Sequence, residues 1–428
     1  MKKTLFSFFA LLALIACENE VFETDVVLQP QAVVADSFYV SYETALQYAA
    51  RVLDEGDSTA VTRASVRSVA DHYEYVANKA TRSAGEAEVR FHVINYEDNQ
   101  GYALVSADSR TTPVYAYSTT GNINIDDAVE NTGFGDFMDA ATDYYIAELE
   151  TTETPASTIT PVLPTPVDTI FELPIEVIDG VIYFVKSEEY SETNPNGILI
   201  ETEWKQNWPY NYYCGERNNS SFYGYRNPAG CGPIAASQVM SYYMYPSSYG
   251  ECVFEWNKIL ASYRYNDVYP NISDNAKAAA YFINKVGVAA NALYSVDSSV
   301  TNSDISSLLR KMGYLFSGLS SYSITNVISS LDNSYPIIVS GLNSNSEGHM
   351  WVVDAYRRFL LKKIYYYESV PHNIYKVKTI QMSMYTHCNW GYGNDKNSNT
   401  CWCLNVFDSP YGAFNVDVKM FYNIRPNK

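Results

Sequence analysis

The chain has 428 residues, a length that predicts two or three domains, and its content of 47% hydrophobic and 18% charged residues excludes a largely disordered protein. The net charge of −19 is unevenly distributed: residues 18–200 contain 32 acidic and 8 basic side chains, whereas residues 201–428 contain 16 and 19. This split excludes a general affinity for nucleic acid and favours docking of one half on the other.

The N-terminus has the pattern of an export signal. Two lysines precede an apolar run that ends at Ala16 and is too short to span a membrane. The sequence LIAC at residues 14–17 resembles the bacterial lipobox, which implies cleavage before Cys17 and lipidation of its thiol. A plain signal peptide is the alternative. We expect a signal peptide over residues 1–16, a tether over 17–36, and a location in the bacterial cell envelope, on the outer membrane or released from it.

Residues 37–150 predict an α+β domain. Helical spacing of apolar residues indicates helices over 38–53 and 134–150, and strict alternation over 89–121 indicates a β-meander. Residues 54–84 are poorly patterned and predict a loop or a weak helix.

The next segment has the composition of a linker. Residues 151–168 contain four prolines and six threonines, which predict an extended connector. A short β-like stretch over 170–186 and a polar segment follow. We predict a linker and activation region over 151–197.

Residues 198–428 predict helices first and strands afterwards, an order typical of an α+β fold. The expected helices cover 231–245, 273–290 and 303–314, the last with Ser303 as a possible N-cap; the expected strands cover 335–342, 348–356, 362–368, 372–387 and 400–407.

Cys231 is the strongest candidate for a nucleophile. Gly230 indicates a turn before it, and Pro233 suits the first turn of a helix. At a helix N-terminus the unpaired N–H groups lower the pKa of a thiol and can donate to an oxyanion. An inert buried cysteine is the alternative.

His349 is the strongest candidate for the base. It begins a strongly apolar strand directly after a glycine, so its ring would be held rigidly and could still face a cleft. His372 and His387 are alternative bases, whereas His72 and His92 lie in the acidic half.

Four ordered motifs resemble the streptopain family of papain-fold cysteine peptidases. They are the opening segment at 204–211, the nucleophile helix at 229–246, the histidine strand at 348–356 and a third motif at 387–393. Residues 96–118 also resemble the inhibitory propeptide of that family. The resemblance implies a peptidase domain over 198–428, built from a helical part and an antiparallel sheet or barrel part, and a propeptide domain over 37–150.

The resemblance also implies further site residues. Gln206 would donate a side-chain N–H to the oxyanion beside the Cys231 amide, and Asn389 and Trp390 would orient and shield His349. Which of Asn389 and Trp390 dominates stays open. The chain departs from the family pattern at Gly232-Pro233, Tyr392 and Asn394, and we expect these departures to alter the pocket rather than the chemistry.

His387, Cys388, Cys401 and Cys403 could suggest a structural zinc site. Their His-Cys and Cys-x-Cys spacings differ from the usual zinc knuckle, and exported proteins more often oxidise such cysteines. We therefore predict no metal and no cofactor, and the pairing of the cysteines stays open.

These patterns together predict a secreted, lipid-anchored cysteine endopeptidase made as a zymogen. Cys231 would form a thioacyl-enzyme, with His349 as general base and acid. Its partners would be protein or peptide substrates, its own propeptide as an intramolecular inhibitor, and a membrane through Cys17, but no nucleic acid. The alternatives are an inactive surface binding or adhesion module and an amidase- or transglutaminase-type acyl transferase.

Overall fold

The computed structural model describes residues 38–54, 67–77, 88–129, 132–151, 175–178, 180–216, 226–262, 270–295, 298–342, 348–366, 374–392, 400–408 and 417–428. The expected signal peptide, Cys17, the tether, most of the expected linker, His372 and Asn394 lie outside these ranges. Residues 38–428 form one compact unit. None of the described helices combines the length and the apolar character that crossing a membrane would require.

The N-terminal region, residues 38–151, is an α+β unit as predicted. Its elements are α1 (Tyr42–Asp54), β1 (Val69–Ala77), β2 (Val89–Tyr96), β3 (Tyr102–Ser106), β4 (Val114–Ser118), α2 (Ile125–Val129) and α3 (Thr132–Thr151). Strands β2, β3 and β4 are the expected meander. Strand β1 lies where the sequence predicted a loop or a weak helix. Its antiparallel pairing with β2 orders this segment, and such a tertiary contact leaves little trace in local patterning.

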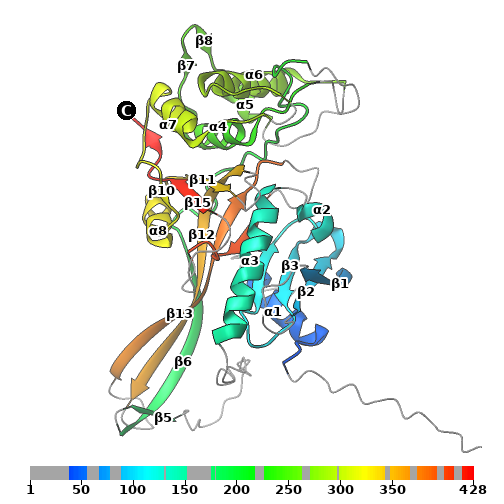
Figure 1. Cartoon of the computed structure of the whole chain (residues 1–428). Coiled ribbons are helices and arrows are strands. Elements are labelled where there is room, and N and C mark those ends of the chain that lie inside the picture. The colour runs from blue at the N-terminus through cyan, green and yellow to red at the C-terminus, as the bar shows by residue number, and fades with distance from the viewer. Residues whose placement is uncertain are drawn as a thin grey trace, which may run out of the picture. The chain divides into compact units, whose positions relative to one another are not determined.

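Four of the five described helices of the C-terminal half gather in one part of the molecule, whereas the last one along the chain packs on the sheet (Figure 1). The five are α4 (Cys231–Tyr243), α5 (Trp256–Leu260), α6 (Asp274–Ala289), α7 (Asn302–Lys311) and α8 (Ile324–Asp332). Helix α7 begins one residue before the expected cap, because Thr301 and Asp304 form a reciprocal capping box. Ser303 is therefore inside the helix and is not its cap. The short α5 and α8 were not predicted.

The strands of this half are β5 (Ile175–Ile178), β6 (Val181–Thr193), β7 (Ser248–Tyr249), β8 (Cys252–Val253), β9 (Tyr314–Leu315), β10 (Ser320–Ser321), β11 (Ile337–Leu342), β12 (Gly348–Tyr366), β13 (Ile374–Asn389), β14 (Thr400–Leu404), β15 (Asp417–Phe421) and β16 (Arg425–Pro426). The main sheet has the order β1-β2-β3-β4-β14-β13-β12-β11-β15-β10. It crosses from the N-terminal region to the C-terminal half at β4 and β14, where Tyr117 pairs with Trp402 and Ala116 with Cys403.

Strand β6 occupies a segment that the sequence assigned partly to a polar loop. It pairs antiparallel with β12, and the two strands run together with β13 away from the helices (Figure 1). Acidic residues of β6 lie directly opposite basic residues of β12, so that Arg358 donates to Glu192 at 2.7 Å and Lys362 lies 3.8 Å from Glu188. Cross-strand charge pairs of this kind stabilise a polar strand. The C-terminal end of the expected linker is therefore part of the sheet of the C-terminal half.

Candidate active site

Cys231 is the first residue of α4, as the sequence predicted. Gly230 precedes it with φ of 89°, a left-handed conformation that favours glycine and lets the chain turn sharply into the helix. The backbone N–H groups of Met350, Gly232 and Cys231 itself face the thiol and lower its pKa, but burial raises the pKa more strongly. The pKa of this thiol is therefore raised in this structure, and the lowering expected from the helix N-terminus is outweighed.

His349 lies at the start of β12 and is only 2% exposed. Its Nε2 bonds the backbone carbonyl of Trp390 at 2.8 Å, and its Nδ1 bonds the Tyr392 hydroxyl at 3.2 Å. The Tyr392 ring stacks on the imidazole with centroids 5.0 Å apart and planes 9° from parallel. Burial lowers the pKa of His349 to about 4, against the opposing effect of the Trp390 carbonyl.

Neither residue is in the ionic form that thiol catalysis needs. At neutral pH a raised thiol pKa keeps Cys231 protonated, and a pKa of about 4 keeps His349 neutral. Both ring nitrogens of His349 are occupied by Trp390 and Tyr392 rather than by the thiol. The Met350 N–H that faces the thiol belongs to the residue after His349, so the two uncharged groups lie on adjoining parts of the structure.

Gln206 lies beside the turn that precedes Cys231. Its backbone carbonyl accepts a hydrogen bond from the N–H of Ala229 at 2.7 Å, two residues before Cys231. The preceding residue, Lys205, forms an antiparallel bridge with Tyr392, next to His349. The half-buried Gln206 is thus connected by its backbone to the nucleophile turn.

Trp390 and Asn389 make different contacts. The Trp390 carbonyl holds His349, while its fully buried ring donates from Nε1 to Cys401 Sγ at 3.4 Å. The Asn389 side chain donates to the Thr202 carbonyl at 2.9 Å and accepts from Gln238 at 3.2 Å. In this covered state the partner of His349 is therefore Trp390, through its backbone, and the Asn389 amide is engaged elsewhere.

Helix α3 of the N-terminal region covers His349. Gly133 lies so close that a Cβ atom there would be 2.5 Å from His349 Cδ2 and 2.7 Å from Trp390 Cε3. Its N–H also donates to the Tyr392 hydroxyl at 3.4 Å. Only a residue without a side chain fits between this helix and the imidazole. No local pattern in the sequence indicated the contact, because the two residues are more than 200 positions apart.

The next turn of α3 fills the space beside His349 with aromatic rings. Phe134 packs edge-on against Trp390, with centroids 6.3 Å apart, and Phe137 packs against Phe407 at 6.5 Å. Trp351, two residues after His349, lies between Trp390 and Phe407. Helix α3 therefore packs on the candidate base His349 and on the aromatic residues next to it.

The four residues considered for zinc do not converge on one point. His387 bonds Asp354 at 2.6 Å; burial lowers its pKa, but the hydrogen bond to Asp354 and the negative charges around the ring, Asp354 first among them, together raise it. The adjacent Cys388 belongs to the other face of β13, where Cys401 and Cys403 have their sulfur atoms 3.3 Å apart. The His387 ring is bonded to Asp354 through Nδ1 and packs against Trp402, whereas it is the residue after His349, Met350, whose N–H faces the Cys231 thiol. Within the described ranges, no three His, Cys, Asp or Glu residues are arranged to hold a metal ion.

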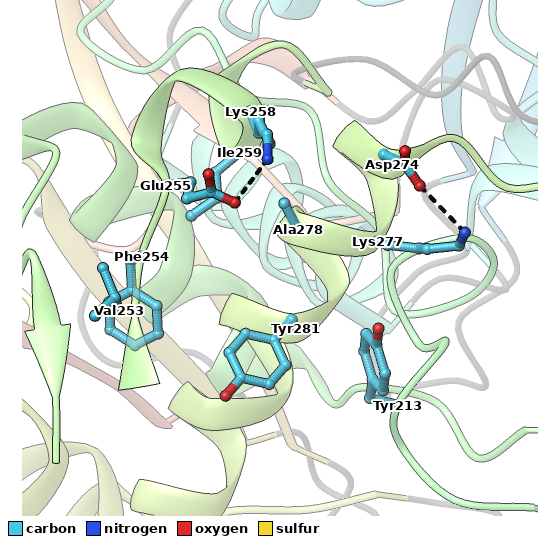
Figure 2. A pocket seen from close by; sticks show the side chains of 10 residues that line it. All are labelled: Tyr213, Val253, Phe254, Glu255, Lys258, Ile259, Asp274, Lys277, Ala278 and Tyr281. Atoms are coloured by element: carbon cyan, nitrogen blue, oxygen red, sulfur yellow. Dashed lines mark hydrogen bonds and ion pairs between the residues drawn. The ribbon is translucent and has the colours of Figure 1, made fainter. Parts of the chain in front are cut away.

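A hollow of about 320 Å³ lies among the helices, between α5 and α6 (Figure 2). Tyr213, Phe254 and Tyr281 line it, and two ion pairs border it, Lys258 with Glu255 at 2.9 Å and Lys277 with Asp274 at 3.3 Å. None of the candidate catalytic residues is part of its lining. This hollow is therefore separate from the site at Cys231.

Two known protein families match the chain. Residues 204–398 match the Peptidase C10 family and residues 37–145 match the Spi protease inhibitor family, so that together the two matches cover more than half of the chain. No curated protein sequence matches it.

The solved structures similar to the chain include two from Prevotella intermedia. A prointerpain A fragment is 17% identical, with a TM-score of 0.51, and the match covers 83% of this chain and all of the fragment. Active interpain A, a cysteine protease, is 19% identical, with a TM-score of 0.35 over 54% of this chain and 94% of that one. The first likeness supports a fold in which a propeptide-like domain precedes the peptidase domain.

The candidate nucleophile and base both fall within the first family match, and the helix that covers His349 falls within the second for most of its length. Residues 204–398 are therefore a domain of the peptidase C10 family of cysteine peptidases, the streptopain family, and residues 37–145 are a domain of the Spi protease inhibitor family that precedes it as a propeptide.

Proposed function

We propose that the chain is a secreted, lipid-anchored cysteine endopeptidase that its own propeptide helix α3 keeps inactive. The observation that carries the proposal is the contact of Gly133 with His349, which lies within a member of a cysteine peptidase family. The lipobox-like sequence that ends at Cys17 supports the anchor, and lipidation there would hold the protein in the bacterial cell envelope.

The reaction we propose is acyl transfer through Cys231. Once α3 leaves, water reaches both groups, which removes the burial that raises the thiol pKa and lowers that of His349. Cys231 then passes its proton to His349, and the resulting thiolate attacks the scissile carbonyl while Gln206 and the Cys231 amide donate to the oxyanion. His349 transfers its proton to the leaving amine, and it then takes a proton from the water that releases the acyl-enzyme.

Activation by this route requires separation of α3 from the sheet that carries His349. The segment between Thr151 and Ile175 joins the propeptide to strand β5, and β6 is fixed on β12. A cut between the propeptide and β5 would therefore leave β6 with the peptidase, and release of α3 would follow once β4 also separates from β14.

The test is to incubate the purified precursor, without its signal peptide, beside a Cys231→Ala variant. We expect the unmodified chain to be trimmed to a C-terminal fragment and to degrade an added protein substrate, and the variant to do neither. A chain that stays inert after an added protease has cut it, and that resists a thiol-alkylating peptide probe, would instead be a binding module.

A further inference from the structure

A buried amide on the nucleophile helix links the parts of the active site. Gln238 lies on α4, seven residues after Cys231, and is fully buried. Burying an amide side chain is costly unless its polar atoms find partners. Both polar atoms of Gln238 have one: Oε1 accepts from the N–H of Trp204 at 3.1 Å, and Nε2 donates to Asn389 Oδ1 at 3.2 Å.

Asn389 extends this link in two further directions. It is 1% exposed, its Nδ2 donates to the carbonyl of Thr202 at 2.9 Å, and its Oδ1 also accepts from the N–H of Gly391 at 3.3 Å. The two amides therefore bond the segment around 202–204 at two points, and they connect it both to α4 and to the turn after β13.

These three segments carry the catalytic candidates. Helix α4 begins with Cys231, the segment around 202–204 leads directly to Gln206, and the turn after β13 holds the Trp390 carbonyl that binds His349. An oxyanion donor acts only if it is held within a few tenths of an ångström of its place, and the surrounding hydrogen bonds determine that precision.

We propose that Gln238 and Asn389 are positioning residues that hold the Gln206 segment in register with Cys231. The inference rests on the proposed function, because it assigns these amides a purpose only if Gln206 serves an acyl-transfer site. It gives Asn389 a role in placing the oxyanion donor rather than in orienting the imidazole.

The first test is Gln238→Met, which removes both hydrogen bonds at similar volume, in the full precursor after activation by an added protease. We expect kcat to fall about 10- to 100-fold with little change in KM, since a small displacement of a catalytic donor can cost about 100-fold. The rate at which iodoacetamide alkylates Cys231 should stay within about twofold of the parent, because that reaction forms no oxyanion.

A double-mutant cycle shows whether Gln238 acts through Gln206. In a Gln206→Ala background, Gln238→Met should lower kcat by less than about twofold, because the donor it positions is already gone. The matched control is Ser237→Ala. Ser237 is equally buried on α4 and its hydroxyl has no hydrogen-bond partner among the residues that the structure describes, so kcat should not change.

Gln238→Glu provides a conservative rescue that a purely structural role would not produce. A protonated carboxyl group can accept from Trp204 and donate to Asn389 as the amide does, whereas an ionised one cannot donate. The activity of this variant relative to the parent should therefore rise as the pH falls.

The outcomes separate the two proposals. Three results would each overturn the positioning role alone. Gln238→Met could keep full activity, or it could lower kcat by its full factor again in the Gln206→Ala background. It could also lower kcat and the alkylation rate equally. An activated parent chain that hydrolyses no peptide would overturn the proposed function, and this inference with it.

Discussion

The two faces of β12 at its N-terminal end serve the site in different ways. Alternate side chains of a strand point to opposite faces, so Met350 and Val352 lie on one face and His349 and Trp351 on the other. The Met350 face packs on α4, where the Met350 sulfur lies close to Gly232. The His349 face packs on α3 of the propeptide.

The two contacts also differ in kind. Around α4, buried amides form direct hydrogen bonds of 2.9 to 3.2 Å between the scaffold segments. At His349, α3 is held by ring packing and by one long hydrogen bond, from Gly133 to Tyr392 at 3.4 Å. Hydrogen bonds between buried amides suit a scaffold that persists in the active enzyme. Ring packing with a long hydrogen bond suits the propeptide helix α3, which must leave His349 on activation. Substitutions on the His349 face should therefore weaken the packing of α3 without disturbing the hydrogen bonds around α4.

The largest effect should come from His349 itself. His349→Ala should lower kcat/KM of the activated enzyme about 1,000-fold or more, because it removes the general base and acid. His387→Gln is the comparison, since that ring is bonded to Asp354 and takes no part in the proposed reaction. It should lower stability but leave the activity of the folded enzyme within a few-fold, and a loss as large as that of His349→Ala would contradict the assignment.

Low pH should destabilise the precursor in which α3 covers His349. In the covered state the pKa of His349 is about 4, whereas an exposed histidine titrates near 6.5. Because the covered ring does not take up the proton, the masked state loses stability as the pH falls from about 6.5 to about 4, by up to about 3 kcal/mol.

This pH effect is measured by unfolding of a Cys231→Ala precursor at pH 7 and pH 4, beside a precursor that also carries His349→Gln. The first should lose more stability between the two pH values than the second, which lacks the titrating ring. Equal losses would show that His349 is not held neutral by the propeptide.

Gly133→Ala should weaken the contact of α3 with His349, although alanine has a higher helix propensity than glycine. Alanine is the better helix former, so a general effect on α3 would stabilise the precursor. The added methyl group would instead meet His349 and Trp390, and overpacking of this kind costs about 1–3 kcal/mol. We expect iodoacetamide to alkylate Cys231 of the intact precursor about 5- to 100-fold faster, and an unchanged or slower rate would contradict the contact.

The smallest effect should come from Tyr392→Phe. It removes the hydroxyl that bonds His349 and Gly133 but keeps the ring that stacks on the imidazole. Loss of such hydrogen bonds costs about 1 kcal/mol, so alkylation of Cys231 in the precursor should rise about fivefold. The activated enzyme, which has lost Gly133, should change by less than twofold in kcat, and a larger fall would place Tyr392 in the reaction itself.

The sequence predicted the elements that carry the site better than the contacts between them. Helix α4 begins at Cys231 as expected, because the glycine and proline around the cysteine encode that turn locally. His349 lies at the start of a strand for a similar local reason. The catalytic roles of these residues and of Gln206, Asn389 and Trp390 stay predictions.

What the sequence could not predict depends on partners far along the chain. Strand β6 is polar and becomes a strand because basic residues of β12, about 170 positions away, lie opposite its glutamates. Gln238 is one of the residues by which α4 resembles the nucleophile helix of the family, but its buried bonds to Trp204 and Asn389 have no local signature. The close approach of Gly133 to His349 has none either, since glycine is also common near helix N-termini that touch no active site.

The most direct test asks whether helix α3 of the propeptide keeps Cys231 unreactive. It compares the rate at which iodoacetamide alkylates Cys231 at neutral pH in the intact precursor and after an added protease has cut between the propeptide and β5. Removal of α3 should expose the thiol and let it ionise beside His349, so we predict a rise of about 100-fold or more. Equal rates before and after the cut would contradict the claim that the propeptide helix keeps this site inactive.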